Sequence, residues 1–232
     1  MPGLAGRLGP ILGVNVDITA RKEAEERQVL LMREVDHRAK NALAVVQAVL
    51  RLTRADSPDA FARAVEGRVA ALARAQTLLA ESRWAGAELR AMLQGELAPF
   101  FGGPGGGTRV VLDGPTVTVA PTMAQPLSMA FHELATNSAK YGALSVPGGR
   151  LTISWTPDPV AGRLRLRWAE TGGPPVAGPP ARRGFGSRVV EITIRDQLGG
   201  TVSPRWEAAG LLCEMDIPLD RALAGWATKA KA

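Results

Sequence analysis

The chain has few of the residues that form disulfides or metal centres. Its 232 residues include one cysteine, Cys213, and two histidines. An internal disulfide is therefore excluded and a Cys/His zinc site would lack ligands, so Cys213 is expected to be a small core residue. No apolar run reaches the roughly 18 residues needed to cross a bilayer. Residues 1–13 also lack the basic start and apolar core of a secretory signal. We expect a cytoplasmic protein without a membrane span.

Aromatic residues are scarce as well, and positive charge is dispersed. The chain has 5 phenylalanines and 1 tyrosine, and its formal charge of +6 comes from arginines spread along the whole sequence. Nucleic-acid binding surfaces concentrate their charge, so we expect solvated surface charge and no nucleic-acid partner. A hydrophobic fraction of 46% and a charged fraction of 22% are typical of a folded globular chain. The length favours two compact cores.

Helical composition dominates the first half. Residues 11–16 are typical of a short strand, and Asp17 and Thr19 can cap a helix after it. No glycine or proline interrupts residues 20 to about 55, which predicts a long helix. Pro58 is well placed to open a second helix that runs to about residue 83. Two long helices in succession predict an antiparallel hairpin.

The second half changes to alternating strands and helices. A short helical segment, 87–97, leads into the glycine-rich residues 102–107. The segments rich in β-branched and apolar residues predict strands at 108–112, 151–156, 164–168, 201–206 and 211–217, and helices are predicted at 124–141 and 187–198. This order predicts an α/β sandwich with helices on one face of a mixed sheet. The chain from Leu219 is expected to be a loose tail.

The first candidate for chemistry is a histidine in the long first helix. At about 100° per residue, the apolar residues of this helix fall on one stripe, and His37 lies well off it. A neutral imidazole, with a reference pKa of about 6.5, can attack phosphorus. Asp36, Arg38 and Asn41 lie close to it in the sequence. A surface histidine without a role is the open alternative.

A second segment combines an acid, an amide and an ammonium on one helix. Glu133, Asn137 and Lys140 are spaced i, i+4 and i+7, so they are expected to share a face. Oxygen ligands suit a hydrated magnesium ion, and an ammonium suits the phosphates that the ion bridges. A solvated helix face is the alternative. Pro126 requires this helix to begin close to it.

Two glycine-containing segments could hold a nucleotide. Glu170 ends a predicted strand just before Gly172 and Gly173, so its carboxylate could accept a hydrogen bond from an exocyclic amine such as that of adenine. Residues 184–188, Gly-Phe-Gly-Ser-Arg, open a predicted helix whose free backbone amides could bind phosphate. Their spacing fits neither the Rossmann nor the Walker A pattern.

In this order, the four segments resemble the HWE-type sensor histidine kinases. The resemblance rests on His-Arg-x-x-Asn from His37, His-Glu-Leu-x-Thr-Asn-x-x-Lys-Tyr-Gly from His132, Trp-x-Glu-x-Gly-Gly-Pro from Trp168 and Gly-Phe-Gly from Gly184. It covers about residues 20–219. The features that name this family are a histidine in the Asn box, here His132, and the Trp-x-Glu box.

The resemblance implies an α+β fold with two functional parts. An antiparallel helical hairpin over residues 21–84 would carry the phospho-acceptor, and a GHKL-type (Bergerat-type) ATP-binding sandwich would follow over residues 85–219. Residues 17–22 are similar to the end of a PAS sensor domain. Residues 1–20 are therefore expected to be the remnant of such a domain and its linker, and residues 220–232 a tail.

The resemblance also implies an ATP-dependent protein-histidine kinase of a two-component system. Its cofactors would be ATP and Mg²⁺, and its partner the receiver domain of a response regulator. His37 would be phosphorylated, Asn137 would hold magnesium with Glu133 as a second candidate, and Glu170 would read adenine. Lys140 and Arg188 are added as phosphate contacts from their charge and placement. The remaining candidates for the nucleotide site are His132, Glu133, Tyr141, Trp168, Gly172, Gly173, Gly184, Phe185, Gly186 and Ser187.

Two other functions stay open. One is a histidine phosphotransfer or scaffold protein with a vestigial ATP domain, and the other is a GHKL-type kinase of serine or threonine in a partner protein. The ATP boxes argue against the first, whereas the second leaves the His37 segment without a purpose. Whether Asp36, Glu34 or neither assists proton removal is also open. The apolar stripe of the first helix needs a partner surface, which the second helix, an intact sensor domain or another subunit could supply. A homodimer is the default expectation.

Overall fold

The structure is a computed structural model that describes residues 17–101, 109–175, 178 and 185–223. The chain divides into two compact units, residues 1–48 and 49–232. The strand expected at 11–16, most of the PAS-like remnant and the glycine-rich residues 102–107 lie outside the described residues. The expected boundary between the helical hairpin and the ATP-binding domain, near residue 84, stays a prediction. It differs from the boundary between the two compact units, since the second unit begins at Val49.

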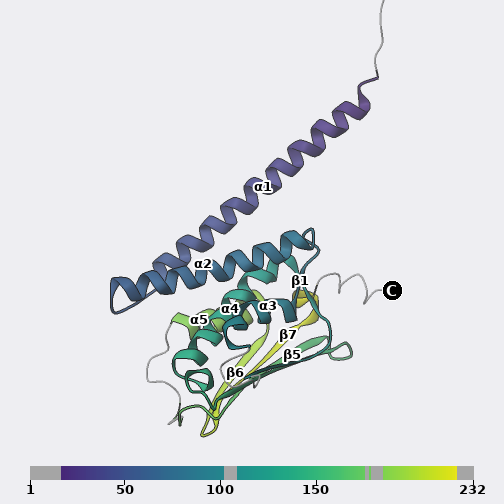
Figure 1. Cartoon of the computed structure of the whole chain (residues 1–232). Helices are drawn as coiled ribbons and strands as arrows, with labels where there is room; N and C mark the ends of the chain where they lie inside the picture. Colours follow the sequence, from purple (N-terminus) through teal and green to yellow (C-terminus); the bar gives the residue numbers. More distant parts are fainter. Residues whose placement is uncertain (1–16, 102–108, 176–177, 179–184, 224–232) are drawn as a thin grey trace, which may run out of the picture. The chain divides into compact units, whose positions relative to one another are not determined.

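The long first helix is confirmed as α1, Thr19–Leu52, with 34 residues (Figure 1). Asp17 caps it, because its Oδ1 accepts a hydrogen bond from the Thr19 N–H at 2.9 Å. An exposed i, i+4 ion pair, Arg21–Glu25, adds a small stabilisation to the first turns. The helix ends three residues before the expected boundary near residue 55.

The second helix, α2, spans Pro58–Glu81. Its start follows the prediction: Pro58 occupies the first turn, and the Ser57 side chain accepts a hydrogen bond from the Ala60 N–H at 3.2 Å. Buried residues recur at helical spacing along one face, at Ala71, Ala75 and Leu79. This face packs against α4 (Pro121–Lys140) and α3 (Leu89–Leu97), so α2 covers the outer side of these helices (Figure 1).

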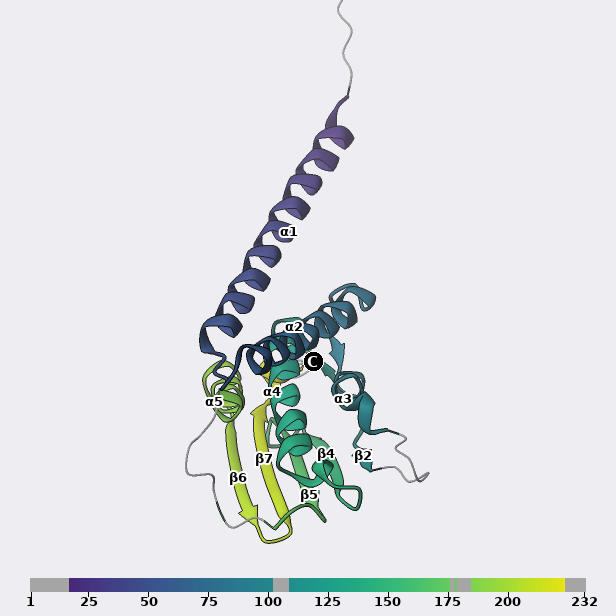
Figure 2. The same cartoon turned by 60° about the vertical axis from the view of Figure 1, so that its left-hand side comes forward.

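A five-stranded mixed sheet forms the other layer, as predicted. Its strand order is β2 (Val110–Asp113), β4 (Arg150–Asp158), β5 (Arg163–Thr171), β7 (Gly210–Pro218) and β6 (Thr201–Glu207). β2 runs parallel to β4, and the other neighbours are antiparallel. Figures 1 and 2 show α4 and α5 (Phe185–Ile192) on one face of this sheet.

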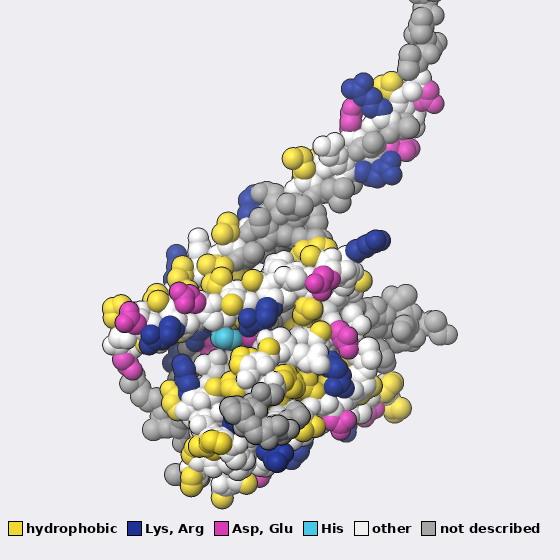
Figure 3. Space-filling model, in the orientation of Figure 1, with side chains coloured by type: hydrophobic (Ala, Val, Ile, Leu, Met, Phe, Trp, Pro, Cys, Tyr) yellow, Lys and Arg dark blue, Asp and Glu magenta, His cyan; other side chains and the backbone are white. Residues whose placement is uncertain are grey.

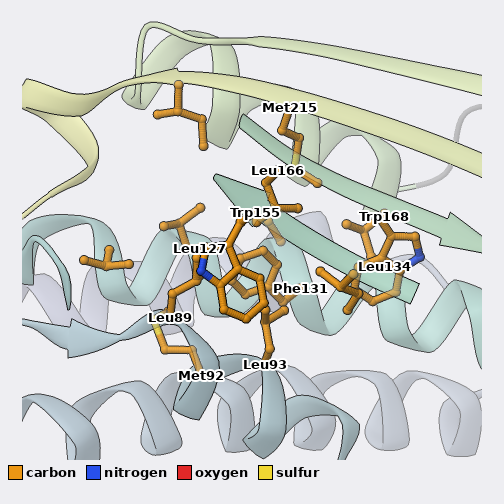
Figure 4. Packing of buried hydrophobic residues seen from close by; sticks show 14 of the residues in the cluster. Leu89, Met92, Leu93, Leu127, Phe131, Leu134, Trp155, Leu166, Trp168 and Met215 are labelled. Atoms are coloured by element: carbon orange, nitrogen blue, oxygen red, sulfur yellow. The ribbon is translucent and has the colours of Figure 1, made fainter. Parts of the chain in front are cut away.

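The core lies between the sheet and the helices. Alternate residues of each strand point inward because side chains in a strand alternate between the two faces. Phe131 of α4, Trp155 of β4 and Trp168 of β5 are each 2% exposed or less and belong to one apolar cluster (Figure 4). Cys213 belongs to the same cluster, which confirms it as a small core residue.

Two helix starts differ from the prediction. Ala87 and Glu88 form a short strand, β1, that pairs with β3 (Thr118–Val119), so the helix expected from residue 87 begins at Leu89. The helix expected from 124 begins at Pro121, which places Pro126 in the second turn instead of the first. Pro126 cannot donate to the Thr122 carbonyl. Thr122 is exposed, so water can satisfy that oxygen.

Residues 219–223, expected to belong to a loose tail, have regular structure instead. Leu219–Ala222 forms a short helix, α6, in which Leu219 and Ala222 are fully buried. The Ala120 N–H donates to the Ala222 carbonyl at 2.9 Å, and Leu223 forms a β-bridge with Val119. The prediction was wrong here because two apolar side chains at i and i+3 face the core. The helix expected at 187–198 comprises α5 and a π-helical turn, Thr193–Gln197.

Candidate functional site

A pocket with a volume of about 580 Å³ lies between the helical layer and the inner face of the sheet. Small-molecule sites are typically about 300–1,000 Å³. The α4–α5 pocket, as we call it, is lined by residues of α4, the loop after it, β5, the segment after β5, α5 with its π-helical turn, β6 and β7. These residues are Leu134, Asn137, Tyr141, Gly142, Ala143, Glu170, Gly173, Pro174, Pro175, Gly178, Gly186, Ser187, Val190, Glu191, Arg195, Val202, Pro204, Trp206, Gly210, Leu211 and Cys213.

Glu170 is a buried carboxylate at the wall of this pocket, 5% exposed. Its Oε1 accepts a hydrogen bond from the Trp168 indole N–H at 3.1 Å, and its Oε2 accepts one from the Ala143 N–H at 2.8 Å. Trp168 and Glu170 share the inner face of β5 because they are two residues apart. Two donors hold the carboxylate in place while its remaining lone pairs stay available to a ligand.

Glycines leave room for this carboxylate. A Cβ on Gly142 would overlap Glu170 Oε2, and a Cβ on Gly210 would overlap the Glu170 backbone carbonyl. Arg109 fixes the loop that supplies the Ala143 donor, because its Nη2 donates to the Ala143 carbonyl at 3.2 Å. Trp168 itself is fully buried and does not line the pocket. It therefore orients Glu170 and contacts no ligand in this arrangement.

Asn137 and the start of α5 form the opposite part of the wall. Asn137 lies half-buried on α4, and Gly186 and Ser187 open α5 beside it. A Cβ on Gly186 would lie 3.4 Å from Asn137 Nδ2, so backbone and amide are in close contact. Gly173 also lines the pocket, whereas Gly172, at φ +68°, lies in the exposed turn beside it. The structure thus brings together residues from all three predicted nucleotide segments.

Glu133 shares a face of α4 with Asn137, since both lie beside Gly186 of α5, but its carboxylate is buried against α2. It is 4% exposed, and both of its oxygens contact Arg68 of α2, at 2.6 Å from Nε and 3.2 Å from Nη2. Lys140 is exposed and outside the lining of the pocket, as is Arg188. The i, i+4 rule predicted the shared face but not that α2 would cover the carboxylate of Glu133.

His132 faces α2 and α3 instead of the pocket. Its Nδ1 lies 3.1 Å from Glu96 Oε2, and its Nε2 would be 3.0 Å from a Cβ on Gly67. Glu96 also accepts hydrogen bonds from Arg74 and Ser128. Burial alone would raise the pKa of Glu96, but the hydrogen bonds from His132 and Arg74 outweigh it and hold this pKa below its ordinary value. His132 therefore belongs to a polar cluster that joins three helices.

Other sequence candidates cannot be placed. The backbone of Asp36, His37, Arg38 and Asn41 lies in α1, within the first compact unit, but their side chains are outside the description. The same holds for the side chain of Phe185, and Gly184 lies outside the described residues altogether.

The chain is similar to known histidine kinases. Residues 34–116 match the HWE histidine kinase family. The chain is 40% identical over 220 residues to a blue-light-activated histidine kinase of Rhizobium johnstonii, and the match covers 92% of this chain and 61% of that protein. A blue-light-activated histidine kinase of Brucella ovis is 36% identical over 220 residues, which cover 93% of this chain and 44% of that protein. The chain is thus similar to histidine kinases along most of its length and to the HWE family over residues 34–116.

Solved structures show the same fold. The blue-light activated histidine kinase of Erythrobacter litoralis EL346 superimposes with a TM-score of 0.59 at 22% identity, over 85% of this chain and 60% of that one. Its separate histidine kinase domain superimposes with a TM-score of 0.52 at 16% identity, over 80% of this chain and 95% of that one. The α+β fold predicted from the sequence is thereby confirmed. The chain spans 61% of the length of the Rhizobium johnstonii protein and 44% of the length of the Brucella ovis protein.

One wall of the pocket could not be predicted from the sequence. Val202, Pro204 and Trp206 alternate along β6 and line the pocket together with Leu211 and Cys213 of β7. Residues two apart on a strand share a face, but this rule does not show that the face meets a ligand site. Burial, with the charges of Glu214 and Glu170, raises the pKa of the Cys213 thiol to about 12, so it stays protonated.

Figure 3 shows positive and negative side chains interspersed over one face of the molecule. Within the part of the chain that the structure describes, no group of three or more His, Cys, Asp or Glu side chains could hold a metal ion. None of the described helices is long and apolar enough to cross a membrane.

Proposed function

We propose that this chain is the kinase part of a two-component sensor that binds MgATP in the α4–α5 pocket, phosphorylates His37 and passes the phosphoryl group to an aspartate of a response regulator. The observation that carries the proposal is the buried Glu170 carboxylate, held by the Trp168 and Ala143 donors at the pocket wall. Such a fixed acceptor suits the exocyclic amine of adenine. ATP is a cytoplasmic substrate, so the proposal includes a cytoplasmic site of action.

The phosphates would lie near Asn137, Gly186 and Ser187. Free amides at the start of α5 suit phosphate oxygens, and these residues line the same pocket as Glu170. Tyr141 and Gly173 would complete the contacts of the nucleotide. Lys140 and Arg188 are exposed, so any phosphate contact from them would come from the rim of the site.

Asn137 is the residue that would hold magnesium. Mg²⁺ usually takes few protein ligands and keeps waters and substrate phosphates for the rest. A single amide oxygen with no acidic cluster among the described residues fits such an ion. Glu133 does not fit as a second ligand, because both of its oxygens contact Arg68. The ion would neutralise phosphate charge when bound.

The γ-phosphoryl group would pass from ATP to His37 in a single displacement. A ring nitrogen of His37 bonds to the γ-phosphorus, the bond to the β–γ bridging oxygen breaks, and ADP leaves with that electron pair. The imidazolium loses its N–H proton to Asp36, Glu34 or water. His37 and the pocket belong to different compact units, so their approach to one another would gate the reaction.

A homodimer is part of the proposal. Met32, Leu43 and Leu50 of α1 are 68%, 63% and 45% exposed. At about 100° per residue they fall on one face of the helix, which favours a partner along it. Light scattering after size exclusion would give the mass; a monomer at all concentrations would contradict this part alone.

The function is tested with γ-labelled ATP and Mg²⁺ on the wild type, His37→Gln and Glu170→Gln. We expect acid-labile, base-stable label on the wild type and none on His37→Gln, because the glutamine cannot form a phosphoramidate. Nucleotide binding should survive in His37→Gln and weaken in Glu170→Gln.

The other outcomes separate the alternatives. Label that persists in His37→Gln and transfers to serine or threonine of a partner would establish the GHKL-type alternative. Absence of both binding and label, with His37 accepting phosphoryl from a phosphorylated regulator, would establish the phosphotransfer alternative. Either result would overturn the proposal.

A further inference from the structure

A buried ion pair joins α2 to the Asn-box helix α4. The guanidinium of Arg68 donates from Nε to Glu133 Oε1 at 2.6 Å and from Nη2 to Oε2 at 3.2 Å. The two side chains are 10% and 5% exposed. Arg68 Nη1 also donates to Thr53 Oγ1 at 2.7 Å, and that hydroxyl donates to the Val49 carbonyl at 2.5 Å. The pair thus connects the end of α1 to α4 through α2.

The same carboxylate touches the wall of the α4–α5 pocket. A Cβ on Gly186 would lie 2.5 Å from Glu133 Oε2, so the backbone at the start of α5 packs directly on this oxygen. Gly186 and Asn137 line the pocket, whereas Arg68 and Glu133 do not. Arg68 therefore lies one residue behind the wall, with Glu133 between them.

Physical chemistry predicts what removal of Arg68 would do. An unpaired carboxylate in this position is costly, because burial without a partner disfavours the charged form. Glu133 would have to take up a proton or turn toward water. Either change alters the surface on which Gly186 rests, and the pocket wall would shift with it.

We propose that Arg68 is a positioning residue through which α2 sets the affinity of the pocket for the phosphates of ATP. The inference rests on the proposed function, since it assumes that the phosphate end lies at Gly186 and Asn137. It adds a regulatory route: a displacement of α2 that lengthens the Arg68–Glu133 contact lowers nucleotide affinity. By linkage, bound nucleotide strengthens the contact by the same factor.

The chain provides a matched control on the same helix. Arg74 of α2 also pairs with a buried carboxylate, Glu96, with 2.5 Å between Nη2 and Oε2. Glu96 belongs to α3 and does not line the pocket, nor does a glycine of the pocket pack against it. Arg74→Ala therefore removes a comparable α2 ion pair without touching the wall.

The test measures binding of MgATP and of adenosine by calorimetry, with thermal unfolding followed in parallel. For Arg68→Ala we expect the Kd for MgATP to rise about 5- to 150-fold, the usual range of coupling between sites, and the Kd for adenosine to change little. Arg68→Lys, which keeps the charge but not the two-pronged contact, should be intermediate. Arg74→Ala should lower the Tm and leave both Kd values within about twofold of the wild type.

The possible outcomes distinguish a failure of the positioning role of Arg68 from a failure of the proposed function. Wild-type affinity in Arg68→Ala, or equal losses for MgATP and adenosine, would overturn the positioning role while the kinase proposal stands. If Arg68→Ala does not fold, Arg68→Lys and Glu133→Gln decide by the same ratio of the two affinities. If the wild type binds no nucleotide, the proposed function is wrong and the positioning role is wrong with it.

Discussion

Replacing Glu170 with glutamine tests how the pocket recognises its ligand. The carboxylate accepts one hydrogen bond at each oxygen, from the Trp168 indole N–H and the Ala143 N–H. A glutamine amide has one oxygen and one NH₂ group, so one of these donors would face another donor. Hydrogen bonds to charged groups contribute about 1.5–3 kcal/mol. We therefore expect the free energy of unfolding to fall by about 1–3 kcal/mol.

The affinity for ATP should also change in Glu170→Gln. If Glu170 accepts from the adenine amine, loss of that contact raises the Kd for ATP about 10- to 150-fold. Discrimination against GTP should fall as well, because an amide can donate to the 6-oxo group of guanine and a carboxylate cannot. Calorimetry with MgATP and MgGTP measures both effects.

Glu214→Gln is the control for this prediction. Glu214 lies on the neighbouring strand β7, where it pairs with Arg205 at half-exposed positions, and such pairs contribute little. We expect unchanged binding and nearly unchanged stability. The reasoning would be refuted if Glu170→Gln bound ATP as tightly as the wild type and kept its preference over GTP.

Two further predictions concern groups whose pKa is shifted. The pKa of Glu96 lies below its unfolded value of 4.5, so its ionised form stabilises the fold above that pH, and this contribution is lost as pH falls through the folded pKa. Urea unfolding should therefore show that Glu96→Gln is less stable than the wild type at pH 7 and loses less stability between pH 5 and acid; parallel pH profiles would contradict this. The thiol of Cys213, with a pKa of about 12, should react slowly with a disulfide reagent at pH 7.5 in the folded protein and rapidly in urea. Equal rates in the two states would show that the thiol is accessible and ionised in the native protein.

Most helices and strands could be predicted from the residues within each segment. Ser57 and Pro58 mark a helix start because capping and a fixed φ act within one turn, and α2 begins there. The strand that carries Trp168 was predicted from its content of β-branched and apolar residues. Short elements such as β1 and α6 were missed because two to four residues carry too little periodic signal, and burial of Leu219 depends on a surface formed by distant segments.

Some contacts in the candidate site could be predicted from the sequence, and others could not. Glu170 and Trp168 could be paired from the sequence, since two residues apart on a strand means the same side. The sequence could not show that Glu133 would turn to Arg68, 65 residues earlier, or that His132 would meet Glu96 instead of a nucleotide. His132 points about 100° away from Glu133 and so meets other neighbours, whereas Glu133 and Asn137, four residues apart, both lie beside Gly186.

By itself, the sequence determined the α+β class, the long helices, the strands of the sheet and the Glu170 segment, because each depends on propensity, capping or alternation within a few residues. Only the tertiary structure decided which faces meet. It placed Trp206 at the pocket wall and Arg68 behind it, and it paired Glu133 with Arg68. Periodicity shows which side chains share a face, whereas the packing of distant segments decides what that face touches.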